Sequence, residues 1–290
     1  MREALLFDSM PNHQVRCQVC EHHCVINAGK RGICGVRENQ NGILYALNDG
    51  LCIAQAIDPI EKKPLYHYLP MTKTYSIASV GCNMICPWCQ NYEISQSPKS
   101  KKTIEGEDIS PEEHVRLAIQ NHCPSISYTY SEPTVFLEYA LDTMKLAHEA
   151  GLKNIWVSNG LMSLKTLELI TPYLDAANID YKGREDVYHK LTLGHEDIIR
   201  RNLKYMHVHK IHVEITTLVI PEVNNNPVDL LEIATFIKNE LDESVPWHLS
   251  RFFPIWKMTD HVMTPIPTLK MAKKIGEETG LKHVYLGNVW

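Results

Sequence analysis

The chain has 290 residues, of which 44% are hydrophobic, enough for one large α/β domain or for a large domain with a small one. Its net charge of −5 argues against a protein that coats nucleic acid, because phosphate neutralisation needs a surplus of Lys and Arg. No stretch reaches the roughly 20 apolar residues of a membrane span, and the N-terminus is too polar for a signal peptide. We therefore expect a cytoplasmic protein without a membrane or nucleic-acid partner.

Residues 1–70 carry an unusual density of cysteines, which we interpret as a small N-terminal knuckle followed by a short hairpin over residues 43–58. Four of the nine cysteines of the chain lie here: Cys17, Cys20, Cys24 and Cys34. Grouped cysteines of this kind indicate metal ligands in a reducing compartment rather than disulfides. Three interpretations stay open: a structural zinc, an auxiliary iron-sulfur cluster, or thiols without metal. We leave His22 and His23 out of this site, since isolated loop histidines are usually just exposed.

Residues 71–290 alternate between strand-like and helix-like patterns. Short β-branched or apolar runs occur near residues 74–80, 125–130, 154–158, 177–181, 211–220, 246–253 and 283–287. Ser110-Pro111 and Asn226-Pro227 each place an N-cap residue and a proline at a helix start. Repeated strand-helix units predict a parallel sheet with ligands at the carboxyl ends of its strands.

The most informative stretch follows the first of these strands and holds Cys82, Cys86 and Cys89 in a CxxxCxxC spacing. Three thiols in one short loop can hold a soft metal centre, that is zinc, copper(I) or an iron-sulfur cluster. A closed zinc site needs a fourth ligand nearby, but the next cysteine, Cys123, lies beyond a predicted helix. One metal position therefore stays open, as in a catalytic centre.

This spacing, with Trp88 directly before the last cysteine, resembles the radical SAM superfamily. There, three cysteines hold a 4Fe-4S cluster, and its fourth iron binds S-adenosylmethionine (SAM), which is cleaved to a 5′-deoxyadenosyl radical. The resemblance implies a partial (β/α)6 barrel over residues 71–290. It also implies a low-potential electron donor of the flavodoxin or ferredoxin type. Structural or zinc-binding thiols are the alternative interpretation.

Polar residues after the later strands extend the resemblance. Tyr130-Ser131-Glu132-Pro133 is similar to the Gly-Gly-Glu-Pro element that holds the SAM amino group, although both glycines are replaced. The third strand ends in a Ser-Asn-Gly turn that resembles the ribose-side element. The fourth ends in an Asp-x-Lys sequence similar to that of glycyl-radical-enzyme activases, and the sixth carries a histidine and an arginine near the mouth. The predicted cofactor-binding residues are Glu132, Ser158, Asn159, Asp180, His248 and Arg251.

Each of these six residues also has a simpler interpretation. The acids can be surface charges or ion-pair partners, the serine and asparagine can cap a turn, and the histidine and arginine can be structural. No sequence feature identifies a residue that acts on the substrate itself.

Longer segments resemble a narrower group, the radical SAM member of the AmmeMemoRadiSam system, which is similar to pyruvate formate-lyase activating enzymes. The similar segments are residues 32–39, 58–67, 88–91, 246–254 and 285–289. We expect an oxidoreductase that cleaves SAM reductively and abstracts hydrogen from an unidentified small-molecule or protein substrate. The alternatives are an activase that forms a glycyl radical on a partner enzyme and a non-catalytic metal-binding or electron-carrier protein.

Overall fold

The computed structural model describes residues 1–289 and is built around one eight-stranded sheet in the order β16-β15-β14-β13-β12-β11-β9-β8. The seven strands from β9 to β16 in this sheet are mutually parallel, and β8 is antiparallel to β9. The strands are β8 (Ala54–Pro59), β9 (Lys73–Ala78), β11 (Ser125–Tyr128), β12 (Lys153–Ser158), β13 (Ala176–Asp180), β14 (His212–Val219), β15 (Trp247–Arg251) and β16 (Val284–Gly287). All seven predicted strands are confirmed.

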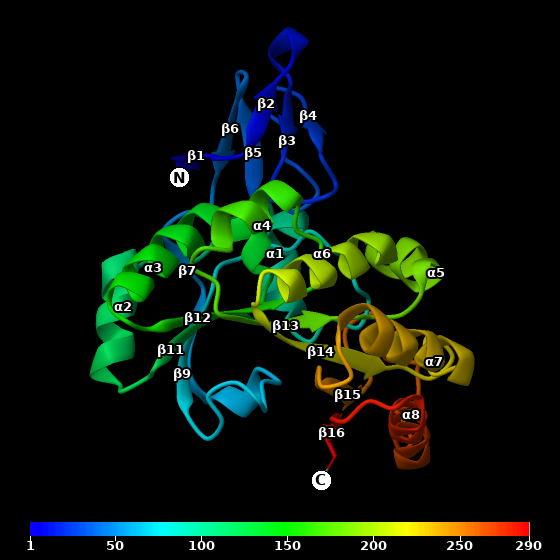
Figure 1. Cartoon of the computed structure of the whole chain (residues 1–290). Helices are drawn as coiled ribbons and strands as arrows, with labels where there is room; N and C mark the ends of the chain where they lie inside the picture. The colour runs from blue at the N-terminus through cyan, green and yellow to red at the C-terminus, as the bar shows by residue number, and fades with distance from the viewer. Residues whose placement is uncertain (290) are drawn as a thin grey trace.

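Helices follow the parallel strands and pack on one face of the sheet (Figure 1). They are α1 (Tyr92–Ser100), α2 (Pro111–Gln120), α3 (Leu137–Glu149), α4 (Leu164–Ile170), α5 (Glu185–Val187), α6 (Glu196–Val208), α7 (Pro227–Phe236) and α8 (Ile266–Thr279). Short turns at Ile60–Lys62 and Pro133–Phe136 precede β9 and α3, and the helical segments Tyr188–Thr192 and Ile237–Leu241 continue α5 and α7. Both predicted caps form, because Ser110 accepts from the Glu113 amide and Asn226 from the Val228 amide.

Six parallel strands are each followed by a helix before β16 closes the series, which is the predicted (β/α)6 arrangement with one further strand. Among residues 1–289, the two outermost strands, β8 and β16, do not pair with each other, so the barrel is partial. No helix within this range is long and apolar enough to span a membrane.

The connection between β8 and β9 fills the inner face at the amino ends of the strands. Trp156 of β12 contacts Met144 of α3 on the helix side, so its neighbour Ile155 faces inward, where Leu65 and Ile60 pack against it. Glu214, near the start of β14, accepts hydrogen bonds from the backbone amides of Tyr66 (3.0 Å) and His67 (2.7 Å) and so holds this connection in place.

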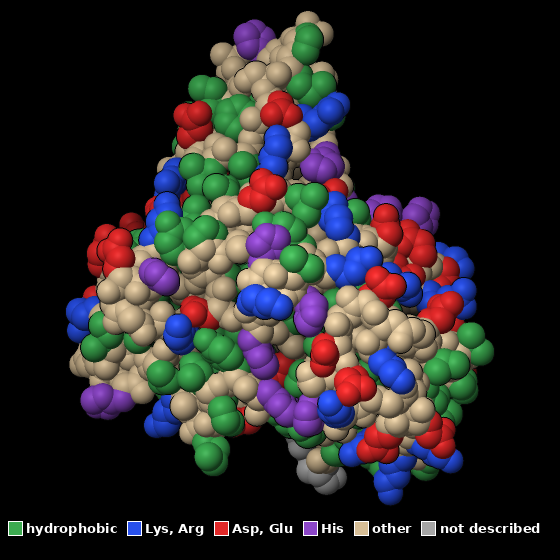
Figure 2. All heavy atoms as spheres, viewed as in Figure 1, with side chains coloured by type: hydrophobic (Ala, Val, Ile, Leu, Met, Phe, Trp, Pro, Cys, Tyr) green, Lys and Arg blue, Asp and Glu red, His purple; other side chains and the backbone are tan. Residues whose placement is uncertain are grey.

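Small antiparallel sheets make up a lobe that rises above the helices and tapers away from the body (Figures 1 and 2). One contains β1 (Arg2–Glu3), β6 (Ile43–Ala46) and β5 (Arg37–Gln40), and the other contains β2 (Phe7–Ser9), β3 (Val15–Cys17) and β4 (Val25–Ile26). A two-stranded pair of β7 (Leu51–Cys52) and β10 (Glu107–Asp108) lies beside the body. Below the lobe, Lys and Arg side chains are interspersed with Asp and Glu, without a large patch of one sign on the face shown in Figure 2.

The hairpin predicted over residues 43–58 is wrong in its range. Strand β6 pairs with β5, whereas β8 pairs with β9 of the main sheet. The apolar alternation in this stretch is real, but it serves two different sheets, and alternation alone does not identify a strand's partner. The domain boundary at residue 70 stays a prediction, although β8, which precedes it, belongs to the central sheet.

Candidate active site

The CxxxCxxC loop lies between β9 and α1, at the carboxyl edge of the sheet. Cys82 Sγ accepts from the Met84 amide at 3.3 Å, and Cys89 Sγ lies 3.3 Å from Ser95 Oγ of α1. Trp88 is buried against Val187, Ile220, Phe252 and Met258, and Cys86 packs beside this cluster. The aromatic residue of the motif thus anchors the loop in the body, while its three cysteines are partly exposed as residues.

The environment of the loop thiols fits a metal centre. Burial raises the pKa of Cys82 and raises that of Cys86 to about 11, where the nearby Lys182 ammonium opposes the shift. A thiolate at neutral pH therefore needs further positive charge close by, which a bound metal centre provides. An unpaired donor points to the same region, because Asn83 Nδ2, next to Cys82, is buried and has no hydrogen-bond partner within residues 1–289.

The spacing of the three sulfurs separates a cluster from a single ion. Four sulfurs at 2.3 Å from one zinc would lie about 3.8 Å apart. Within residues 1–289, the only three acidic, histidine or cysteine residues whose ligand atoms all lie within 4.8 Å of one another are the surface residues Glu185, His195 and Asp197. The three loop thiols are therefore spread more widely than one ion requires. In an iron-sulfur cluster each thiolate binds a different iron, so wider spacing is expected.

Glu132, Ser158 and Asn159 come together at the ends of β11 and β12. The Glu132 carboxylate is 2% exposed and accepts from the Thr134 amide (3.0 Å), Thr134 Oγ1 (2.6 Å), Ser158 Oγ (2.8 Å) and the Asn159 amide (2.9 Å). Burial raises the pKa of Glu132, and these hydrogen bonds oppose the shift. The carboxylate thus joins the two strand ends.

Asn159 connects this group to the cysteine loop. Its Nδ2 donates to Asn83 Oδ1 at 2.7 Å and lies 3.7 Å from Cys82 Sγ, while its Oδ1 accepts from the Leu161 amide at 3.0 Å. Asn159 therefore lies beside Cys82, the predicted cluster ligand, and hydrogen bonds at both its Nδ2 and its Oδ1 fix the orientation of its amide group.

Asp180, predicted to bind the cofactor, forms an ion pair with Lys182 at an N···O distance of 2.6 Å, as its simpler interpretation expects. The lysine side chain is only 11% exposed, whereas that of the aspartate is 41% exposed and stays accessible to a ligand. Burial lowers the pKa of Lys182, but Asp180 and the thiols of Cys86 and Cys82 raise it more, so the net direction is upward. A permanently charged ammonium therefore lies beside the loop.

His248 lies away from the cysteine loop, whereas Arg251 is the last residue of β15, at the carboxyl edge of the sheet. His248 Nε2 lies 2.6 Å from the Glu214 carboxylate and its ring stacks on Tyr285, in the amino-terminal region that the β8–β9 connection fills. Arg251 donates from Nε to the Thr264 carbonyl at 2.8 Å and lies over the Phe253 ring. His248 was expected near the mouth because β-strand spacing alone does not give the height of a residue within a tilted barrel. A cofactor-binding role for Arg251 stays a prediction.

Two residues that the prediction omitted do contact the loop. Asn83 lies inside the motif itself, and Lys99 of α1 donates from Nζ to the Met84 carbonyl at 2.7 Å. Lys99 follows Gln96 by three residues on the helix after the motif, and Gln96 Nε2 also donates to Met84 O (3.1 Å). The i, i+3 spacing of these two polar residues on one helix face was the only sequence feature that could have indicated their contact with the loop.

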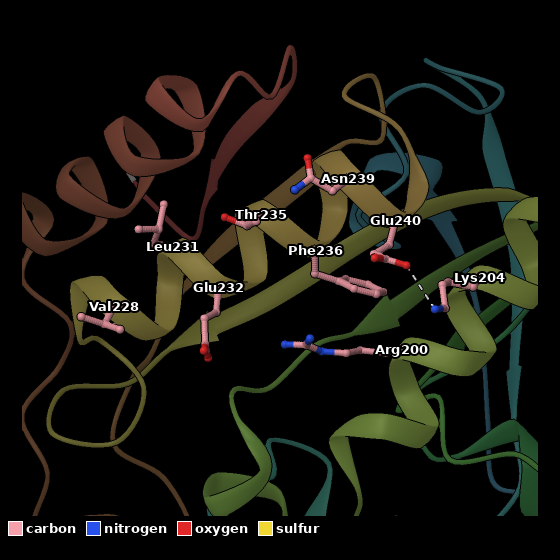
Figure 3. A pocket seen from close by; sticks show the side chains of 9 residues that line it. All are labelled: Arg200, Lys204, Val228, Leu231, Glu232, Thr235, Phe236, Asn239 and Glu240. Carbon is pink, nitrogen blue, oxygen red and sulfur yellow. Dashed lines mark hydrogen bonds and ion pairs between the residues drawn. The ribbon is translucent and has the colours of Figure 1, made fainter.

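A surface groove lies away from the cysteine loop, between α6 and α7 on the outer helical layer (Figure 3). Arg200 lies over the Phe236 ring at 5.1 Å, and Lys204 pairs with Glu240 at 3.1 Å. The fourth charged residue, Glu232, pairs with Arg184 outside the groove at 3.0 Å. Each charged group of the groove thus has a partner or a ring contact, and the groove contains none of the predicted site residues.

Comparison with known proteins assigns the family. The model of the radical SAM superfamily matches residues 76–234, and the chain belongs to this superfamily. An uncharacterized protein of Methanocaldococcus jannaschii is 45% identical over 289 residues, which cover 100% of this chain and 86% of that protein. A putative glycyl-radical enzyme activating enzyme from the same organism is 28% identical over 166 residues, covering 55% of this chain and 66% of that protein.

Solved structures agree on the fold. The crystal structure of a radical SAM methyltransferase from Sphaerobacter thermophilus superimposes with a TM-score of 0.55 at 14% identity, covering 76% of this chain and 67% of that chain. Membership in the superfamily implies an enzyme that uses a 4Fe-4S cluster and SAM.

Proposed function

We propose that Cys82, Cys86 and Cys89 hold the 4Fe-4S cluster and that the protein cleaves SAM reductively to abstract hydrogen from a substrate. When bound, the cluster supplies one electron that splits a sulfur-carbon bond of SAM and yields the 5′-deoxyadenosyl radical. The observation that carries this proposal is the set of three widely spaced thiols on a loop at the carboxyl edge of the sheet.

The residues around the loop take distinct roles in this proposal. Asn159 and Asn83 present amide groups next to Cys82, and the unpaired Asn83 Nδ2 is a donor for a sulfur or cofactor atom. Lys182 compensates the charge of the deprotonated thiols, and the exposed oxygen of Asp180 can accept from a cationic or hydroxyl group of the cofactor. Glu132 is a positioning residue, since its hydrogen bonds go to the two strand ends.

The direct test is anaerobic incubation of the reduced, reconstituted protein with SAM, with 5′-deoxyadenosine measured by mass spectrometry. Cys82→Ala, Cys86→Ala and Cys89→Ala should each abolish the product, because the loop has no spare ligand. Cys123→Ala is the matched control, since Cys123 is buried outside the loop and should leave product formation unchanged. Product formation by Cys82→Ala at the wild-type rate would refute the assignment. SAM binding without cleavage under reducing conditions would favour the non-catalytic alternative.

A glycyl-radical activase is the second candidate. It is supported by the similarity to a putative activating enzyme and by the Asp180–Lys182 pair beside the loop. The edge strands β8 and β16 do not pair within residues 1–289, which is compatible with the open barrel side that an activase needs. If the substrate is a small molecule, the enzyme should consume SAM in proportion to the amount of substrate converted. An activase should instead produce one 5′-deoxyadenosine for each glycyl radical detected by electron paramagnetic resonance on the partner.

A further inference from the structure

Four cysteines of the N-terminal lobe form a second site that the proposed SAM chemistry does not use. They surround one small cavity of about 20 Å³, which Ile26, Ile33 and Val135 make largely apolar. Three of the four are buried and the fourth is partly buried. We call Cys17, Cys20, Cys24 and Cys34 the lobe thiols.

The lobe thiols are too far apart for a single zinc ion. A zinc site needs sulfurs about 3.8 Å apart. Within residues 1–289, no three of the lobe thiols have sulfurs that all lie within 4.8 Å of one another. The loop thiols Cys82, Cys86 and Cys89 share this wide spacing. Both sets are therefore spaced more widely than one ion requires, as expected when each thiolate binds a different metal atom of one cluster.

A buried cation accompanies the lobe thiols. Arg37 lines the cavity and donates from Nη1 and Nη2 to the carboxylate of Glu138 at 2.8 and 2.6 Å, with side-chain exposures of 2% and 0%. Its Nε is buried and has no hydrogen-bond partner within residues 1–289, although Cys17 and Cys34 lie within electrostatic reach. An N–H donor of this kind stabilises anionic sulfur and tunes the potential of a cluster, whereas a neutral thiol is a weak acceptor.

The lobe thiols lie directly beside the cysteine loop of the barrel. A Cβ atom on Gly81 would lie 3.3 Å from the Cys34 carbonyl, so the two cysteine-bearing segments run close together. His22, which lines the lobe cavity, donates from Nε2 to the Asn83 carbonyl at 2.7 Å, because the carbonyl can only accept. The Lys99 ammonium is within electrostatic reach of Cys34 and of all three loop thiols. Figure 1 shows the same relation, with the lobe rising above α1.

We propose that the lobe thiols bind an auxiliary iron-sulfur cluster rather than zinc, and that this cluster passes single electrons to the cluster of the barrel loop. In each transfer the lobe cluster loses one electron and the loop cluster gains it, and a ferredoxin or flavodoxin restores the lobe cluster. No proton or bond is involved. The lobe cluster has a different set of ligands from the proposed function, whereas the electron transfer rests on the loop cluster of that function; both are tested without measuring SAM cleavage.

The test is elemental and spectroscopic analysis of the full chain, purified and reconstituted anaerobically. The triple variant Cys82→Ala/Cys86→Ala/Cys89→Ala removes the loop ligands, and Cys20→Ser/Cys24→Ser removes two lobe ligands. With two cubanes, the wild type should contain about eight irons and each variant about four, while Cys123→Ser keeps about eight. The triple variant should keep the circular dichroism of the wild type and show a cluster signal by Mössbauer spectroscopy.

Zinc gives the opposite pattern. About one zinc and no iron in the folded triple variant, with about four irons in the wild type, would overturn the proposal. The electron path has its own measurement, because two reduced clusters this close should broaden each other's paramagnetic resonance signals. Signals in the fully reduced wild type equal to the sum of the two variants would refute the path. If eight irons are present but SAM is not cleaved, the proposed function fails and the auxiliary cluster stands.

Discussion

Replacing Glu132 by glutamine separates a carboxylate that positions strand ends from one that contacts the cofactor by its charge. The three donors on Oε1, from Thr134 and Ser158, can all be kept by the amide oxygen of glutamine. The new NH₂ group then faces the backbone amide of Asn159, which loses its acceptor at 2.9 Å. A lost charge-assisted hydrogen bond costs about 1.5–3 kcal/mol, and the unpaired buried N–H adds about 1–3 kcal/mol.

Part of this cost is recovered. Burial raises the pKa of Glu132 above its ordinary value, so ionisation of the carboxylate opposes folding at neutral pH, and the uncharged glutamine removes that opposition. We expect a net loss of about 2 kcal/mol in the free energy of unfolding. Asn159 should also shift relative to Asn83 and Cys82. We expect this shift to weaken SAM binding by about 1.4 kcal/mol, which corresponds to a tenfold lower affinity.

Equilibrium SAM binding, iron content and chemical unfolding of Glu132→Gln provide the assay, with Ser158→Ala as the informative partner. Ser158→Ala removes one hydrogen bond to the carboxylate but keeps its charge. If Glu132 acts by positioning, both variants weaken SAM binding at normal iron content. If it acts by charge on the cofactor, only Glu132→Gln does. Glu168→Gln, on the exposed side of α4, is the neutral control. Wild-type stability and affinity in Glu132→Gln would refute the reasoning.

Two further predictions concern the scaffold. Burial would raise the pKa of Glu214, but hydrogen bonds from two histidines and two backbone amides hold it at about 2, so its stabilising contribution is present above about pH 4.5 and is lost as the pH falls toward 2. Glu214→Gln should therefore lower the free energy of unfolding at pH 7 by about 3 kcal/mol and flatten its acid dependence, unlike Glu168→Gln. Gly81→Ala should cost about 2–4 kcal/mol and reduce iron loading, because φ is +105° and the new Cβ would lie 2.8 Å from Val36. Gly151→Ala shares a positive φ (+77°) but meets nothing within 4 Å, so a loss equal to that of Gly81→Ala would rule out the contact with the lobe as the cause.

The parts of the fold that follow from local patterns were predictable. The strands of the barrel are short β-branched runs, and the helix starts at Ser110 and Asn226 carry caps whose hydrogen bonds form as expected. The cysteine loop was predictable because a three-thiol motif is local and its spacing limits what it can bind. These features depend on residues that are close in sequence.

The parts that depend on distant partners were not predictable. His248 looked like a mouth residue, yet Glu214 on the next strand holds it at the opposite end of the barrel. Glu132 was predicted as a cofactor-binding residue from its local motif, which does not show that two of its hydrogen-bond donors come from the end of another strand 26 and 27 residues away. Lys99 carried no motif at all. Register and strand tilt decide such contacts, and both are set by packing across the whole sheet.

Tyr130 stands where the similar motif of the superfamily has a glycine, and contacts of its side chain with a distant segment offset the backbone strain at this position. Its backbone is in the left-handed region, with φ at +64°, so the conformation that favours glycine is kept at a cost of about 1–2 kcal/mol. The side chain offsets this cost: its hydroxyl donates to Asp58, and Lys63, which pairs with Asp58 at 2.6 Å, lies 4.3 Å above its ring. Asp58 and Lys63 belong to the segment 58–67 that also marks the narrower resemblance. That segment therefore does two structural tasks, since its first half supports the strained turn before Glu132 and its second half is held by Glu214 at the other end of the barrel.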